Sequence, residues 1–465
     1  MKGPLNIRKP EEHRRELEKV QKVYQGGRQK DQVQVHFPTG SLTEMIGRNP
    51  FSSHGQLQRR MIRSFLRIGA TRKSTMDHMQ DALEILKSVP LIDGHNDWPH
   101  LIRGFYDNRL DERFDSGRSL VGHVDLERLR KGMSGGAFWS VYVDCPATDD
   151  FADDASHFEA LRDTLQQIDL VYRLVDLYAD SMGIIEKSSD IMPLFQSRKF
   201  VSLIGVEGLH QIANSPSVLR LYHRLGVRYI TLAHTKNNLY ADSATSSFPV
   251  HGGLSEKGIA IVREMNRVGL IIDLSHTSEA VMQQVLDLSE APVVFSHSAV
   301  ASIVPHVRNV SDEILHKLKT NNGVIMITFI PSLIHVDASK ASIDHIVDHI
   351  MYVGGLIGYD HIGLGSDYDG MFSAVKGVED VAQYPFLVAQ MLERGIARSD
   401  IEKVLGHNVI RVLKDVEAQA MICKARDPVL QEGVKQLWND NFRAMVEQTY
   451  PRAEKSLSTK RLNVS

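Results

Sequence analysis

Eight runs of apolar residues constrain what this chain can fold into more than any other feature of its sequence. They recur between residues 89 and 370, and longer segments with helical spacing separate them. Because the runs lack polar alternation, they predict strands covered on both faces, as in a parallel sheet. Eight strand–helix units in succession predict an α/β fold, the (β/α)8 TIM-like barrel. The runs are residues 89–97, 136–144, 200–208, 227–234, 269–276, 292–298, 323–330 and 361–370.

One segment between the runs carries clear helix signals. Residues 255–269 read SEKGIAIVREMNRVG, with Ser255 before the first turn and Gly269 after the last. Serine is a common N-cap, and glycine tolerates the left-handed conformation that ends many helices. We therefore expect a helix that begins just after Ser255 and ends just before Gly269.

The N-terminal segment differs from the rest of the chain in charge. Residues 1–75 contain 16 Lys or Arg and 6 Asp or Glu, whereas the whole chain has a net charge of −3. This segment has no sustained apolar period, which predicts a mostly irregular, partly disordered structure. We expect a basic extension over residues 1–78, a barrel domain over residues 79–450 and a polar tail over residues 451–465. Within the extension, the arginine-rich residues 56–72 could form a short amphipathic helix.

Composition excludes several classes of protein. With 42% apolar and 24% charged residues, the chain is neither fibrous nor wholly disordered. It has no run of about 18 apolar residues, so we expect no transmembrane segment, and its net charge gives no reason to expect a nucleic-acid partner. Two cysteines, Cys145 and Cys423, cannot supply a disulfide framework. Without an apolar leader or anchor tail we expect a cytoplasmic protein, with a mitochondrial presequence from Met45 as the alternative.

Polar residues stand at the ends of the apolar runs, which in such a barrel meet at one rim. The first run ends with His95 and Asp97, two positions apart, so both side chains project to the same side of a strand and can chelate one metal ion. On its own this motif is weak, because a core histidine beside a solvated aspartate is more common. Glu207 is the single acid in its run, and a buried carboxylate requires a partner such as a metal ion.

Two further runs end in histidine, a ligand suited to zinc. These are His276 and His297. Together with His95, Asp97 and Glu207 they are too many ligands for one catalytic zinc with an open position, so we expect two ions. We assign His95 and Asp97 to the first ion, His276 and His297 to the second, and Glu207 as the bridge. A hydroxide held between the ions would attack a polarised carbonyl.

Three more residues are candidates for the reaction itself. His234 could donate to the oxyanion, with a metal-ligand or structural role as the alternative. Asp367 could carry a proton from the water to the leaving amine, and Asp369 competes for that role. Arg308 could clamp a substrate carboxylate, although spacing alone favours an ordinary surface arginine. For Cys145, nothing in the sequence indicates a base beside the thiol.

Seven motifs, in order, resemble the membrane dipeptidase (renal dipeptidase) family of binuclear zinc peptidases. The resemblance covers roughly residues 80–415 and implies an amidohydrolase-type barrel that hydrolyses dipeptides, with L or D residues at the second position and Cys-Gly units in some members. It implies the same roles for the ligands and for His234, Arg308 and Asp367. A homodimer is an expectation from the family alone. The motifs are IDGHND, GVEG, TLAH, LIIDLSH, VVFSHS, RNVSD and GSDYDG.

The chain departs from the animal members at one position. In those relatives a cysteine follows the histidine matching His234 by two positions and pairs with the cysteine matching Cys145. Lys236 stands there in this chain, so that disulfide cannot form. The loop over residues 236–257 is expected to overhang the site.

These observations predict a zinc-dependent dipeptidase whose partner is its dipeptide substrate. The alternatives are another amidohydrolase-type enzyme, a lactonase or deaminase, on the same metal frame, and a non-catalytic scaffold protein recruited through the basic extension. The H-x-D pair of His95 and Asp97 argues against the first alternative, because many amidohydrolases carry H-x-H there. The complete ligand set argues against the second.

Overall fold

A closed barrel of eight parallel strands lies at the centre of the computed structural model, which describes residues 75–115, 117–147, 151, 153–428 and 436–450. Neighbouring strands pair in parallel all the way round, and the pairing of β2 with β4 closes the ring. Each predicted apolar run contains one of these strands, so the predicted (β/α)8 barrel is confirmed. The strands are β1 Ile92–Asn96, β2 Gly136–Val141, β4 Phe200–Glu207, β5 Val227–Thr231, β6 Ile271–Asp273, β7 Val294–Ser298, β8 Val324–Ile327 and β9 Ile362–Leu364.

One additional strand was not expected. β3, Met182–Ile184, pairs with the first three residues of β4 and takes no part in closing the ring. It is three residues long and only its first residue is fully buried, so it leaves no apolar run in the sequence.

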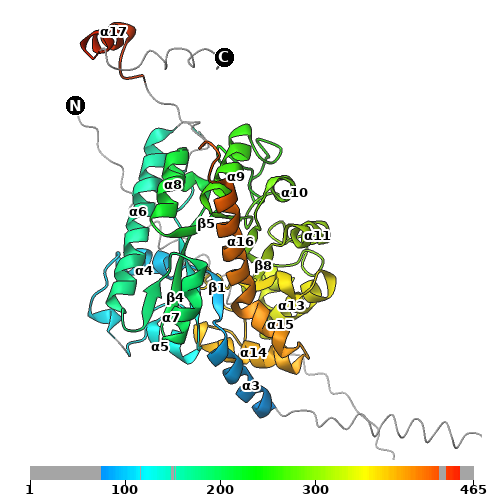
Figure 1. The fold of residues 1–465 in the computed structure, drawn as a ribbon. Coiled ribbons are helices and arrows are strands. Elements are labelled where there is room, and N and C mark those ends of the chain that lie inside the picture. Colours follow the sequence, from blue (N-terminus) through cyan, green and yellow to red (C-terminus); the bar gives the residue numbers. More distant parts are fainter. Residues whose placement is uncertain (1–74, 116, 148–150, 152, 429–435, 451–465) are drawn as a thin grey trace, which may run out of the picture. The chain divides into compact units, whose positions relative to one another are not determined.

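Most of the helices before α17 lie on the outside of the barrel (Figure 1). The helix predicted between Ser255 and Gly269 is confirmed as α9, because the Ser255 side chain accepts from the backbone N–H of Gly258 and Gly269 adopts a φ of 89°. A π-helical turn, Lys403–His407, joins α15 to α16. The helices are α3 Thr75–Ser88, α4 Trp98–Tyr106, α5 Leu126–Lys131, α6 Asp154–Leu177, α7 Ile191–Gln196, α8 Pro216–Arg224, α9 Glu256–Val268, α10 Glu279–Leu288, α11 Asp312–Asn321, α12 Pro331–Ile334, α13 Ile343–Leu356, α14 Tyr384–Glu393, α15 Arg398–Glu402, α16 Asn408–Cys423 and α17 Asp440–Thr449.

The strands bury side chains on both faces. In β4, Val201 and Leu203 pack with Phe138 and Met326 in one apolar cluster, whereas Ile204 belongs to a second cluster shared with the helices. Successive strand residues point to opposite faces, so continuous apolar sequence is what such a strand requires. The rigid barrel that results fixes the positions of the residues at its rim.

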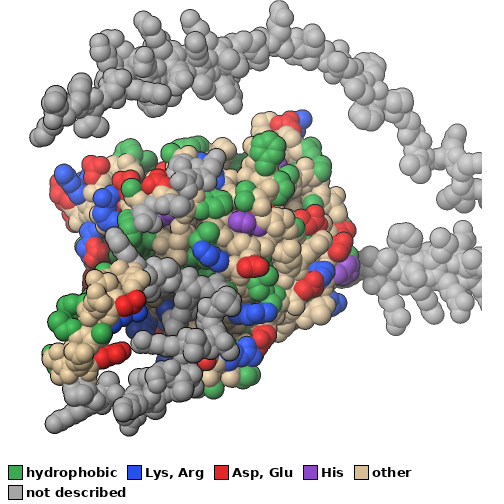
Figure 2. All heavy atoms as spheres, turned by 90° about the horizontal axis from the view of Figure 1, so that it is seen from above, with side chains coloured by type: hydrophobic (Ala, Val, Ile, Leu, Met, Phe, Trp, Pro, Cys, Tyr) green, Lys and Arg blue, Asp and Glu red, His purple; other side chains and the backbone are tan. Residues whose placement is uncertain are grey.

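The predictions for the chain ends fall mostly outside the described residues. These include the basic extension up to residue 74, the helix over residues 56–72, the presequence from Met45 and the polar tail over residues 451–465. α3 begins at Thr75, within the last residues of the predicted extension. In the described part of the chain, no helix combines the length and apolarity needed to cross a bilayer. Acidic and basic side chains lie interspersed on the face drawn in Figure 2.

Candidate active site

The residues predicted at the strand ends do gather at one end of the barrel. His95 and His297 lie in β1 and β7, Glu207 is the last residue of β4, and the others follow their strands closely. They surround a pocket of about 310 Å³ at the carboxyl ends of the strands. The residues that line this pocket include Asp97, Glu207, His234, His276, Arg308 and Asp367.

Glu207 lies between two groups of histidines. Its Oε2 is 3.6 Å from Nε2 of His95, and its Oε1 is 3.1 Å from Nε2 of His276 and 3.3 Å from Nε2 of His297. On the first side, Nε2 of His95 is also 3.3 Å from Oδ2 of Asp97. The two carboxylate oxygens therefore face the two ligand pairs that the sequence predicts for two different ions.

Several polar atoms in this cluster have no hydrogen-bond partner among the described residues, although they are buried. They include Nε2 of His95, Oδ1 of Asp97 and Nδ1 of His276. In addition, Nε2 of His276 and Nε2 of His297 face each other at 2.9 Å. Buried polar atoms are rarely left unpaired, and imidazole with carboxylate is a donor set that suits zinc. The residues present therefore fit metal binding.

Three overlapping groups of side chains bring their ligand atoms close enough to hold a cation. Each contains at least one imidazole and one carboxylate, and Glu207 belongs to two of them. Two of the groups add His234 and Asp367 to the five predicted ligands, so both of these side chains also lie within the cluster. The groups are His95 with Asp97 and Glu207, Glu207 with His234 and His276, and His95 with His297 and Asp367.

The two catalytic carboxyl candidates experience opposite electrostatic environments. Burial by itself raises the pKa of Glu207, but the neighbouring His95 and His234 outweigh burial and hold that pKa well below its ordinary value. Burial also raises the pKa of Asp367, and here the negative charge of Asp97 adds to the increase, so that pKa lies well above its ordinary value. Carboxyl groups separated in this way suit different roles, one as a permanent anion and one as a proton carrier.

Asp367, not Asp369, faces the pocket. Asp369 accepts a hydrogen bond from the backbone N–H of His123, and its Oδ1 is 3.0 Å from Nδ1 of the same histidine. His276, Asp367 and Asp369 all have positive φ angles, between 65° and 68°. Non-glycine residues rarely adopt this conformation, and such strain often marks functional positions.

Arg308 is buried, with 5% of its surface exposed, so the interpretation as an ordinary surface arginine is wrong. It lines the pocket, and its Nη2 is 3.4 Å from the carbonyl oxygen of His297. Its Nη1 has no hydrogen-bond partner among the described residues. Burial lowers the pKa of Arg308 to about 10, which leaves the guanidinium charged at neutral pH.

Residues behind the ligands were missed by sequence reasoning. The Tyr229 hydroxyl is 2.8 Å from Nδ1 of His95. Ser296 Oγ is 2.9 Å from Nδ1 of His297 and donates to Oδ2 of Asp273 at 2.6 Å. Partners of this kind fix the orientation of a metal-binding imidazole. Of these three residues, only Asp273 could have been found from the sequence, because it is an acid inside an apolar run.

Cys145 does have imidazoles beside it. Its Sγ is 3.9 Å from Nδ1 of His210 and 3.9 Å from Nδ1 of His234. Burial by itself raises the pKa of this thiol, but the two histidines lower it to about 5. Both cysteines are free. Lys236 donates to the carbonyl oxygen of Ala147 at 2.8 Å.

The barrel and the cluster of imidazoles and carboxylates at its rim place this chain in the class of (β/α)8 metallohydrolases. The sequence profile described as membrane dipeptidase (peptidase family M19) matches residues 79–426, and the chain belongs to this family. The chain is accordingly a metal-dependent hydrolase of dipeptides.

Individual relatives agree with this family. Dipeptidase tcpJ of Claviceps purpurea is 53% identical over 394 residues, covering 80% of this chain and 93% of the relative. Dipeptidase verJ of Clonostachys rogersoniana is 48% identical over 377 residues, covering 80% and 96%. A Rhodobacter sphaeroides metallopeptidase, crystallised with a phosphinate mimic of the dipeptide L-Ala-D-Ala, superposes with a TM-score of 0.64 at 24% identity, covering 71% of this chain and 99% of that one. This structural similarity supports the fold alone.

Proposed function

We propose that this chain hydrolyses dipeptides with two zinc ions, one held by His95 and Asp97, the other by His276 and His297, and both by Glu207. The observation that carries the proposal is the position of Glu207, whose two oxygens face different histidine groups at 3.1–3.6 Å. Bound there, the ions would polarise the scissile carbonyl and supply a hydroxide nucleophile near neutral pH.

The side chains behind the ligands prepare the imidazoles for this role. If Nδ1–H of His95 donates to the Tyr229 oxygen at 2.8 Å, its Nε2 lone pair points at the pocket. Ser296 and Asp273 orient His297 in the same way. The ligands are thus held in place by the barrel before any ion binds.

Two cationic or donating groups position the substrate. Arg308 binds the carboxylate at the C-terminal end of the dipeptide, because its guanidinium is buried, charged and free at Nη1. His234 donates to the oxygen of the peptide carbonyl as negative charge develops there, since it lines the same pocket with its Nε2 3.7 Å from Glu207. Together they orient the peptide bond across the ligand cluster.

Asp367 moves the proton. Its Oδ1 is 3.7 Å from Nε2 of His95, so it can reach a water at the cluster and then the leaving amine. A raised pKa brings a carboxyl group closer to the operating pH, which improves both uptake and release of a proton. A bound cation would offset part of this increase.

The substrate class follows from the size and chemistry of the pocket. A volume of about 310 Å³ suits a small ligand, and Ile330 and Leu333 give it an apolar wall. We propose dipeptides of the form L-Xaa-L/D-Xaa, with Cys-Gly units among them. The dipeptidase names of the relatives and the L-Ala-D-Ala mimic in the Rhodobacter enzyme support this choice.

Metal analysis of the purified protein, combined with a substrate panel, tests the proposal. The panel contains L,L and L,D dipeptides, Cys-Gly, a tripeptide, a lactone and an aminopurine. We expect two zinc ions per chain and turnover of the dipeptides alone. One ion at full activity would refute the bridged pair, and turnover of the lactone or aminopurine in preference to dipeptides would refute the substrate class.

A further inference from the structure

A second cavity lies at the opposite end of the barrel from the active site. It has a volume of about 540 Å³ and is lined by Gly135, directly before β2, Phe200, the first residue of β4, and Ser181, directly before β3. The amino ends of parallel strands lie opposite the rim that carries Glu207. The cavity is therefore separate from the catalytic pocket.

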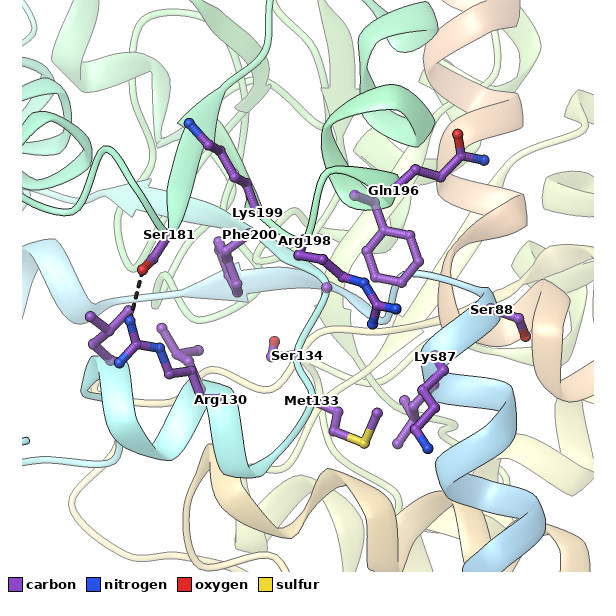
Figure 3. A pocket seen from close by; sticks show the side chains of 15 residues that line it. Lys87, Ser88, Arg130, Met133, Ser134, Ser181, Gln196, Arg198, Lys199 and Phe200 are labelled. Atoms are coloured by element: carbon purple, nitrogen blue, oxygen red, sulfur yellow. Dashed lines mark hydrogen bonds between the residues drawn. The ribbon is translucent and has the colours of Figure 1, made fainter.

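The charged residues around this cavity are all basic. Lys87, Arg130, Arg198 and Lys199 line it, and none of its lining residues is Asp or Glu (Figure 3). Arg130 donates to Oγ of Ser181 at 2.7 Å and Lys199 to the carbonyl oxygen of Ala179 at 2.8 Å. Four cations around one hollow without a counter-charge in its lining create a positive potential there.

Two of these cations have no protein partner in the part of the chain that the structure describes. Lys87, in the last turn of α3, and Arg198, in the turn between α7 and β4, form no side-chain hydrogen bond or salt bridge with described residues. Both are exposed, so both can meet a ligand. Arg198 has a φ of 69°, a conformation that favours glycine or asparagine, yet the turn carries arginine.

Apolar side chains also line the cavity. Leu126, Leu129 and Met133 line it together with the rings of Phe195 and Phe200. A simple inorganic anion would leave these side chains without a contact, whereas an apolar molecule would leave the cations without one. A ligand that satisfies both has an anionic group at one end and an apolar body at the other.

We propose that this cavity binds a small organic anion, a phosphate or carboxylate attached to an apolar group of a few carbon atoms. Lys87 and Arg198 contact the anionic group, and the apolar side chains of the lining receive the apolar body. The basic residues 1–74 of the same chain are a poor occupant, because 16 Lys or Arg and 6 Asp or Glu give residues 1–75 the same sign of charge as the cavity.

Calorimetric titration of the metal-loaded enzyme tests the proposal. A phosphinate dipeptide mimic is kept at saturation, so that the catalytic pocket is filled. The probes are hexyl phosphate, hexanoate, inorganic phosphate and hexanol. We expect saturable one-to-one binding of hexyl phosphate, hexanoate or both, and at least about tenfold weaker binding of inorganic phosphate and hexanol. The stronger of the first two identifies the anionic group.

Two double variants localise the binding. K87A/R198A should raise the Kd of the bound probe at least about tenfold. The control R263A/K319A removes the same charge from exposed positions of α9 and α11, and its Kd should stay within about twofold of wild type. Dipeptide hydrolysis should be unchanged in both. The proposal is overturned if neither organic anion binds saturably or if both variants weaken binding equally.

Discussion

The two ends of the barrel use charge in opposite ways. At the carboxyl ends, His95, Glu207 and His297 are at most 4% exposed. The carboxylate of Glu207 lies within 4 Å of the imidazoles of His95 and His297. At the amino ends, Lys87 and Arg198 are exposed around a cavity without acids in its lining. Buried charges interact strongly, whereas water screens exposed ones. Substitutions at the first end should therefore change catalysis far more than substitutions at the second.

The largest effect is expected from Glu207→Gln, which removes the anion that the two proposed ions would share. The amide cannot bind two cations through negative oxygens, so kcat should fall by about a thousandfold or more. Stopped assays with a dipeptide and zinc analysis of the same sample measure this. Glu313→Gln, on the exposed side of α11, is the control. Half the wild-type kcat with two zinc ions bound would contradict the bridging role.

Asp367→Asn should have the second-largest effect on activity, because an amide cannot carry the proton. We expect kcat to fall by about a hundredfold to ten-thousandfold. In the wild type, the raised pKa predicts that activity declines on acidification at a higher pH than the ordinary value of 3.8 would give. Asp369→Asn tests the neighbouring acid and should cost less activity, since its carboxylate bonds to His123. The reverse order of the two variants would assign the proton transfer to Asp369.

Arg308→Ala should act mainly on KM. Loss of a charged contact to the substrate carboxylate predicts an increase of about tenfold to a hundredfold for dipeptides with a free carboxyl end. Dipeptides with an amide cap lack the contact, so their KM should change little. Steady-state kinetics on both series decide the matter, and an equal increase for capped substrates would refute the clamp.

Tyr229→Phe should have a smaller effect, on zinc affinity. The variant keeps the ring that packs on Phe138 and removes the hydroxyl 2.8 Å from Nδ1 of His95. Loss of such a supporting contact lowers metal affinity by about tenfold to a hundredfold. Competition with a chelator measures it, and unchanged affinity would mean that the hydroxyl does not orient His95. Tyr222→Phe, whose hydroxyl bonds to Gln211, is the matched control.

The smallest effect is expected at the amino ends of the strands. Lys199 lines the second cavity and donates to a backbone carbonyl, away from the catalytic pocket. Lys199→Met should leave kcat/KM for dipeptides within about twofold of wild type. A tenfold loss of kcat/KM would show that the two ends of the barrel are coupled. Substitutions at the amino ends would then affect catalysis, contrary to the comparison drawn above.

The sequence was informative where a local pattern determines the structure. Eight apolar runs predicted eight strands, since burial on both faces demands continuous apolar residues, and the polar run ends located the site. β3 was missed because three residues carry too little pattern.

Glu207 and Asp273 show where such reasoning stops. Both are buried acids in apolar runs, but Asp273 accepts from Thr231, Ser275 and Ser296. Glu207 instead meets histidines from across the barrel. The partner of each acid depends on how strands far apart in the sequence align, and local sequence patterns do not determine that alignment.

The left-handed backbone at His276, Asp367 and Asp369 has a consequence for how this protein can evolve. Each such non-glycine residue costs the folded state roughly 1–2 kcal/mol. Glycine would relieve that cost, so a selection for heat resistance alone should replace these three residues early. Under the proposed roles of His276 and Asp367, the most heat-resistant descendants would then be poor peptidases, and thermal tolerance has to be gained elsewhere in the chain.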